Sequence, residues 1–112
     1  MGKFRKCKLC WNRSKSKQVV GYRLYWSKDG KPDYGSNYFD LGNVKEVVLP
    51  DVLKLNSRYP FRINLGVSAV DIYGNESDIL SLPAPYTNEV PLQPTELSLT
   101  EIDEFVTVEI NW

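Results

Sequence analysis

Cys7 and Cys10 are the residues best suited to chemistry, and they form a C-x-x-C motif. A structural zinc site takes four nitrogen or sulfur ligands, so this pair would need a second chain to complete one. A redox C-x-x-C pair sits at the start of a helix, which lowers the thiolate pKa, whereas this pair falls in a predicted strand. Residues three apart on a strand have Cα atoms about 10 Å apart, too far for a disulfide. We therefore predict Cys7 in the core and Cys10 as a free surface thiol.

Three acids surround one predicted turn, namely Asp71, Glu76 and Asp78. Carboxylates suit a hard cation such as calcium, but their spacing is not that of an EF-hand loop. Asp, Asn and Gly are also ordinary turn formers. A paired-carboxylate glycosidase site would need a cleft, which a sandwich of this size rarely provides. We expect no metal and no cofactor.

The 112 residues include no His. This excludes Ser-His-Asp and Cys-His catalysis and removes the commonest metal ligand. The sequence also shows neither a nucleophile–base pair nor a phosphate-binding Gly loop. We expect that the chain is not an enzyme.

Charge is divided unevenly along a chain with 14 basic and 14 acidic residues. Residues 1–32, the basic head, hold ten Lys and Arg against one Asp, and residues 33–112 hold thirteen acids against four bases. Either the two parts form different solvated faces, or the basic head attracts the acidic end, within one chain or between chains. We expect no nucleic-acid partner, because the acidic remainder would repel phosphate.

Alternating apolar residues predict strands throughout, and no segment shows a helical stripe. Gly30 and Gly74 mark predicted turns. In the first long strand the alternation places four residues inward, namely Val20, Tyr22, Leu24 and Trp26. In the second it places five residues inward, namely Phe61, Ile63, Leu65, Val67 and Ala69. The tyrosines left as candidates for exposure are Tyr25, Tyr34, Tyr38, Tyr73 and Tyr86. Many short strands at regular spacing predict an all-β antiparallel sandwich. The predicted strands cover residues 4–11, 19–27, 37–41, 45–49, 61–71, 78–82, 96–100 and 105–112.

Four segments together resemble a fibronectin type III domain of the bacterial type. They are Lys8-Leu9-Cys10-Trp11, Gly21-Tyr22-Arg23-Leu24-Tyr25-Trp26, residues 39–44 and residues 68–77. The resemblance covers residues 4–82, lettered as strands B to G. It implies an immunoglobulin-like β-sandwich that acts as a spacer or adhesion unit, with contacts on the loops at its poles.

The chain departs from the family pattern in three ways. The first strand, A, is missing before residue 4, and Ile63 stands where the family has the Tyr of its tyrosine corner, with Tyr59 lying earlier. The chain also continues past strand G. Residues 94–100 look like an A strand and residues 106–112 like a B strand, in which Trp112 falls on Trp11 at an offset of 101.

These departures define the predicted organisation. We expect a sandwich over 1–82, a Pro-rich linker over 83–95, and a strand pair over 96–112 that closes the same domain or exchanges with another chain. The alternative is that residues 96–112 are part of a neighbouring domain and have no role here. The sequence has no signal peptide or bilayer-spanning run, which predicts no membrane insertion. We expect a cytoplasmic protein or a fragment of a larger secreted or virion protein.

The leading functional prediction is a non-catalytic protein-binding or scaffold module. We expect loop 12–18 and hairpin 72–77 to lie at one pole and to bind the protein partner. One alternative is a self-assembling structural protein, a homodimer or head-to-tail assembly, in which the acidic C-terminal strands exchange with the basic N-terminal half. Another is an accessory module of a larger secreted enzyme or phage tail protein. The predicted partner-binding residues are Arg13, Lys15, Lys17, Tyr73, Asn75 and Glu76.

Overall fold

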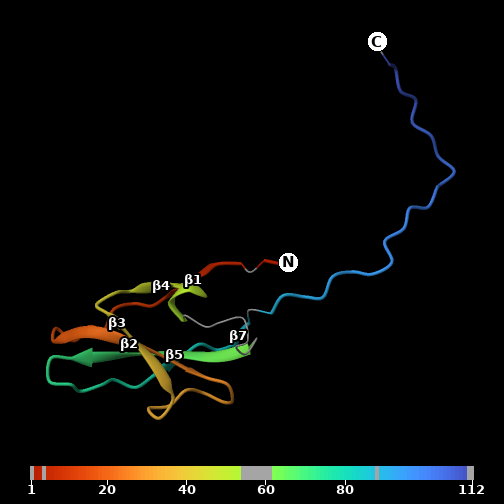
Figure 1. The fold of residues 1–112 in the computed structure, drawn as a ribbon. Coiled ribbons are helices and arrows are strands. Elements are labelled where there is room, and N and C mark those ends of the chain that lie inside the picture. The colour runs from red at the N-terminus through yellow and green to blue at the C-terminus, as the bar shows by residue number, and fades with distance from the viewer. Residues whose placement is uncertain (1, 4, 54–61, 88, 111–112) are drawn as a thin grey trace.

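The fold is built from short antiparallel strands. The computed structural model describes residues 2–3, 5–53, 62–87 and 89–110. Within this part there is no α-helix, and no helix is long and apolar enough to cross a membrane. The elements, shown in Figure 1, are β1 (Cys7–Cys10), β2 (Val19–Ser27), β3 (Asn37–Gly42), β4 (Glu46–Leu49), the 3-10 helix η1 (Asp51–Leu53), β5 (Arg62–Asp71), β6 (Leu80–Ser81) and β7 (Tyr86–Thr87).

The larger sheet has the strand order β3-β2-β5-β6, and β7 also pairs with β5. The long strands β2 and β5 form its centre, with Leu24 opposite Val67. The strand β6 pairs with the middle of β5, whereas β7 pairs with its first two residues. Both ladders are antiparallel, as the alternation predicts.

The smaller sheet pairs β1 with β4, from Cys7 opposite Leu49 to Cys10 opposite Glu46. Because β3 pairs with β2 in the larger sheet, the consecutive strands β3 and β4 belong to different sheets. The chain changes sheet after Gly42, whose φ of 77° lies in the left-handed region that glycine tolerates.

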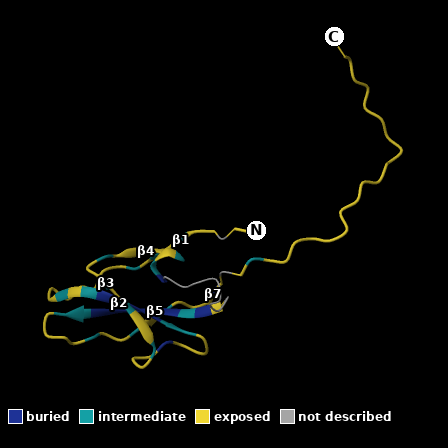
Figure 2. Ribbon diagram, in the orientation of Figure 1, coloured by how far each residue is buried: buried dark blue, intermediate teal, exposed yellow. Residues whose placement is uncertain are grey.

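One apolar core lies between residues of both sheets. The predicted inward residues of β5 are all buried, and Leu24 of β2 and Leu49 of β4 join them. Trp11 packs on Tyr22 with ring centroids 5.6 Å apart. Figure 2 shows the buried residues mostly on β2 and β5 and the exposed ones along the tail. The buried core cluster consists of Tyr22, Leu24, Leu49, Leu53, Ile63, Leu65, Val67, Ala69 and Tyr86.

Three side-chain predictions were wrong. Val20 was expected inward but is exposed, because a bulge between Val19 and Gly21 removes it from the ladder and turns Val19 to the core. Tyr25 was expected to be exposed but is 1% exposed, since neighbouring side chains cover the outer face of β2. Tyr86 was also expected outside but is buried, because β7 joins the sheet.

The predicted linker over 83–95 is only partly a linker. Its residues Tyr86 and Thr87 form β7, so the ordered domain extends at least to this strand. The chain then passes the N-terminal arm, where Gly2 lies directly against the side chain of Val90. The two ends of the domain therefore lie side by side.

The tail, defined here as residues 91–110, extends away from the sheets as a single exposed strand-free segment (Figure 1). The strands predicted at 96–100 and 105–112 are not formed in its described part, and it does not close on its own domain. The extents of 76 × 32 × 22 Å and the radius of gyration of 22.6 Å reflect this tail. Compact chains of this length have a radius near 13 Å. Three residues used in the predictions above lie outside the described residues, namely Tyr59, Phe61 and Trp112.

Candidate functional site

The outer face of the larger sheet carries two rows of side chains that cross its strands. In the first row Arg23 lies opposite Asp40 of β3 and opposite Ser68 of β5. In the second row Tyr25 lies opposite Tyr38 and opposite Gly66. These residues alternate along β2 with the core residues Tyr22 and Leu24, so the strand periodicity itself turns them outward.

Glu76, from the segment after the last turn, lies over this face and binds its polar groups. Arg23 Nη1 donates to Glu76 Oε1 at 3.0 Å, while the hydroxyls of Tyr25 and Ser68 both donate to Oε2. The Arg23 side chain is 29% exposed and the Glu76 side chain 16%, so the ion pair is largely shielded from water. Arg23 Nε also donates to Asp40 at 3.0 Å. Both oxygens of Glu76 are thus occupied by the protein's own donors, and the network holds structure together rather than offering a base to a substrate.

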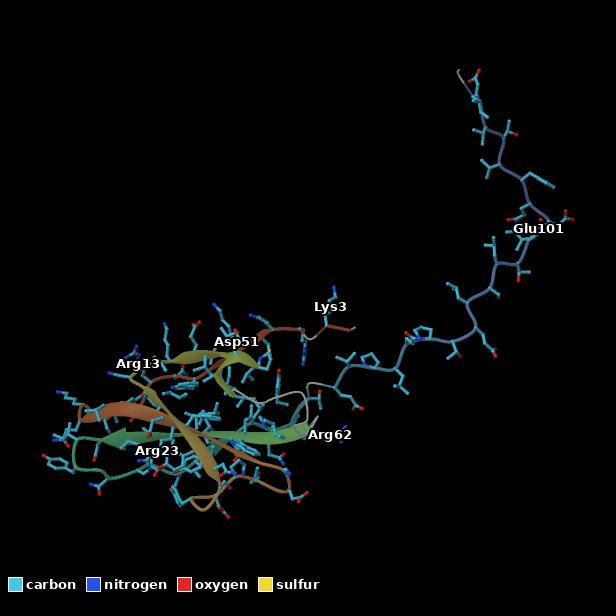
Figure 3. All side chains as sticks on the ribbon, viewed as in Figure 1. Lys3, Arg13, Arg23, Asp51, Arg62 and Glu101 are labelled. Atoms are coloured by element: carbon cyan, nitrogen blue, oxygen red, sulfur yellow. The ribbon has the colours of Figure 1, made fainter. Side chains whose placement is uncertain are left out.

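Three tyrosine rings pack against one another on the same face. The buried ring of Tyr25 meets Tyr38 at a centroid distance of 5.3 Å and Tyr34 edge-to-face at 6.2 Å. The Arg23 guanidinium lies 4.6 Å from the centroid of the Tyr38 ring, a cation–π contact. The hydroxyl of Tyr34 donates to the Ser77 carbonyl at 2.7 Å. We call the set Arg23, Tyr25, Tyr34, Tyr38 and Glu76 the tyrosine face. Figure 3 places Arg23 among densely packed side chains of this sheet.

The electrostatics of the tyrosine face follow from this packing. Burial on its own would raise the pKa of Glu76, but the hydrogen bonds from Ser68 and Tyr25 and the charge of Arg23 outweigh it and hold that pKa below its usual value. Burial, and then the hydrogen bond to Glu76, raise the pKa of Tyr25. The hydrogen bond to Asp40 is the main reason why the pKa of Arg23 is raised. Arg23 and Glu76 are therefore charged, and Tyr25 neutral, around neutral pH.

The pole formed by loop 12–18 and hairpin 72–77 is assembled in part. The Ile72 amide donates to the Gln18 carbonyl at 3.0 Å, which joins the loop to the hairpin. A cavity of about 230 Å³ lies there between Ser14, Ser16 and Asn75. The Asp71 carboxylate accepts hydrogen bonds from the backbone amides of Tyr73 and Asn75 and so shapes the turn.

The six residues predicted to bind a partner do not form one cluster. Lys15, Lys17, Tyr73 and Asn75 are exposed at the pole. Arg13 is also exposed, and it donates to Asn43 Oδ1 at 3.1 Å on the loop between β3 and β4. Glu76 instead belongs to the tyrosine face.

Sequence reasoning missed Arg23 and Ser68 and placed Tyr25 only as an exposed candidate. The available signal was the strand period, because Arg23 and Tyr25 occupy the two outward positions between the inward Tyr22, Leu24 and Trp26.

The two cysteines lie as predicted, with Cys7 partly buried against the core and Cys10 exposed, and both are free thiols. Across the described ranges, no group of three or more His, Cys, Asp or Glu side chains is arranged to hold a metal ion. Asp71 and Glu76 are occupied by the hydrogen bonds given above.

Comparison with known proteins adds no relative. No protein-family model matches the chain, and neither a curated protein nor a solved structure is significantly similar to it.

Proposed function

We propose that the chain is a fibronectin type III-like β-sandwich that acts as a non-catalytic protein-binding module. The sheet membership supports this fold. With β1, β2, β3, β4, β5 and β6 lettered B, C, C′, E, F and G, the smaller sheet holds B and E and the larger holds C′, C, F and G. Immunoglobulin-like sandwiches divide these strands between their sheets in the same way.

The single observation that carries the binding proposal is the fixed position of two exposed tyrosines. Tyr34 and Tyr38 expose roughly half of their surface and rest on the buried ring of Tyr25. Exposed aromatic rings supply contact area, and rings already held by neighbours lose little conformational freedom on binding. Tyr and Arg are also the residues that most often dominate interface energies. The tyrosine face is thus the surface best prepared to contact a protein.

The pole predicted from the sequence is the second candidate surface of the same module. It presents Lys15 and Lys17 beside the exposed Tyr73. Tyr73 has its backbone amide held by Asp71, but no ring contact in the described part of the chain fixes its side chain. We therefore rank it below the tyrosine face.

The test compares matched tyrosine variants. The wild-type chain, Tyr38→Ser and Tyr73→Ser are immobilised at equal density and exposed to extract from the source cells, with free wild-type chain as competitor. We expect at least one protein that the competitor displaces, retained by Tyr73→Ser and lost with Tyr38→Ser, while thermal unfolding shows that both variants fold.

Two outcomes count against the proposal. Equal retention by Tyr38→Ser, with loss on Tyr73→Ser, would move the site to the pole. The absence of any competitor-displaced protein would count against a binding module altogether.

A further inference from the structure

We propose that the unpaired edge of β1 binds residues 97–100 of the tail of a second copy of this chain. This inference concerns a different surface from the tyrosine face and goes beyond the proposed function.

The first observation is the open edge. Within the described ranges β1 pairs only with β4, so its other edge has no strand beside it. The Trp11 amide donates to Lys45 across that pairing at 3.0 Å, which places the main-chain groups of Cys7, Leu9 and Trp11 toward β4. By alternation, the amides and carbonyls of Lys8 and Cys10 face the open edge. Unpaired main-chain groups of this kind are a template for an added strand.

The second observation is an apolar groove beside that edge. A cavity of about 130 Å³ is lined by Trp11 at the end of β1, Val67 of β5 and Leu80 of β6. Leu80 is 70% exposed, and the indole nitrogen of Trp11 is buried with no hydrogen-bond partner in the described structure. The seam between the edge strands of the two sheets is therefore incompletely filled.

The third observation is an unused strand in the tail. Leu97 and Leu99 are fully exposed, and further along the tail Ile102, Phe105, Val106, Val108 and Ile110 are exposed as well. Removing such side chains from water favours association. Glu96 has a φ of 56°, so the extended segment that the tail offers begins at Leu97. Residues 97–100 then match the four residues of β1 in length.

Geometry fixes how the two strands would meet. An antiparallel strand that turns Leu97 and Leu99 inward places them opposite Trp11 and Leu9, over the groove. The same register sets Ser98 opposite Cys10 and Thr100 opposite Lys8, which are the positions whose main-chain groups are open. Ser98 and Thr100 then face solvent.

Charge complements this register. The arm before β1 carries Lys3 and Arg5, whereas the tail carries acids and no base. Lys6 and Lys8 add positive charge beside them but already pair with Asp51 and Glu46 of their own chain. Figure 3 shows Lys3 on the N-terminal arm and Glu101 far out on the tail of the same chain. The attraction between such exposed charges weakens as salt is added.

The tail of the same chain is less able to pair with the open edge of β1 than the tail of a second copy. The tail leaves beside Gly2 and Lys3, at the end of the molecule where β1 begins (Figure 1). To pair antiparallel with its own β1, it would have to pass the whole strand and reverse within residues 91–96. These six residues span at most about 20 Å, and Pro91 and Pro94 favour an extended path through them. A second copy needs no reversal.

The test is a disulfide across the proposed pair. The variant Ser98→Cys places a thiol opposite the native Cys10, at the Cα distance of about 5.5 Å that suits both an antiparallel pair and a disulfide. Under mild air oxidation we expect dimers and longer species on a non-reducing gel. Peptide mapping should show Cys10 joined to the introduced thiol, with a yield that rises with protein concentration and falls with salt.

Matched variants control for non-specific oxidation. Thr107→Cys carries an exposed tail thiol outside the register. We expect at least about tenfold less linked dimer from it, because its Cα does not meet that of Cys10. Adding Cys10→Ser to Ser98→Cys should abolish the species. These changes lie on the surface, so the fold and the tyrosine face are preserved and a failure here leaves the binding proposal standing.

Three results would overturn the inference. One is equal cross-linking by Thr107→Cys, and another is a concentration-independent link within one chain. Wild-type protein that stays monomeric by light scattering at high concentration and low salt, together with no linked dimer from Ser98→Cys, would also overturn it.

Discussion

The phenol of Tyr25 donates a hydrogen bond to the carboxylate of Glu76, 51 residues further along the chain. Tyr25 lies on the central strand β2, and Glu76 follows the turn at the end of β5. The contact closes the outer face of the sheet, because the segment that carries Glu76 also covers Ser68. The carboxylate of Glu76 therefore helps to hold and cover the outer face of the sheet through hydrogen bonds, whereas apolar contacts hold the inner face.

Removing the charge of Glu76 should lower the free energy of unfolding. In Glu76→Gln the ion pair with Arg23 is lost and a largely shielded guanidinium keeps only Asp40 as a charged partner. We expect a loss of about 2 kcal/mol, between that of a neutral hydrogen bond and that of a fully buried pair. Urea unfolding measures it. Asp78→Asn, an exposed acid two residues away, should change the value by less than about 0.5 kcal/mol. Equal effects would mean that the network adds no stability.

The lowered pKa of Glu76 predicts a dependence of stability on acid. An unfolded Glu titrates near 4.5, above the folded pKa, so below this pH the unfolded chain binds more protons than the folded one. The contribution is complete above about pH 4.5 and is lost as the pH falls through the lowered folded pKa. The difference in unfolding free energy between wild type and Glu76→Gln should therefore stay constant above about pH 4.5 and shrink as the pH falls below it. A constant difference would contradict the assignment.

Tyr86 should be a core residue despite its place in a Pro-rich stretch. It is 6% exposed and pairs with Ile63 at the start of β5. We expect Tyr86→Ala to cost about 3 kcal/mol, as for other large aromatic truncations in cores. Thermal or urea unfolding is the measurement. Tyr73→Ala, at an exposed position, is the matched control and should leave stability nearly unchanged. If both variants unfold alike, β7 does not hold the domain together.

The two cysteines should react at different rates. Cys10 is exposed on β1, whereas Cys7 packs partly against the core. A short pulse of maleimide, followed by mass spectrometry, should label Cys10 first, and Cys10→Ser should remove the fast phase. The rates should differ because the reagent reaches the exposed thiol of Cys10 more easily than the partly buried thiol of Cys7. Equal labelling of Cys7 would show that β1 separates from β4 in solution.

Much of the strand framework could be predicted because burial leaves a period of two in the sequence. The alternation of Ile63, Leu65, Val67 and Ala69 identified the core face of β5, and Cys7 and Leu9 did the same for β1. The predicted strands over 37–41 and 45–49 also matched β3 and β4, although nothing in the local sequence indicated that these two strands belong to different sheets.

The three wrong side-chain predictions arose where strand alternation alone does not determine whether a side chain is buried. Tyr25 occupies an outward position but is covered by Tyr34, Tyr38 and Glu76. A period of two in the sequence shows which face of the sheet a side chain is on, but it does not show whether other side chains cover that face. The bulge at Val20 shifts the pattern by one residue. Tyr86 depends on pairing with a strand more than twenty residues earlier in the chain, which local sequence does not encode.

The closeness of Gly2 and Val90 has a mechanical consequence. A tension applied between these two residues would enter and leave the domain at one end, so it would not pass along the length of the sheets. It would act on the short strands next to the two ends, and separate β1 from β4 and β7 from β5 one hydrogen bond after another. We therefore expect the domain to yield at low force when pulled through these residues, and β2 and β5 to remain paired after β1 has come away.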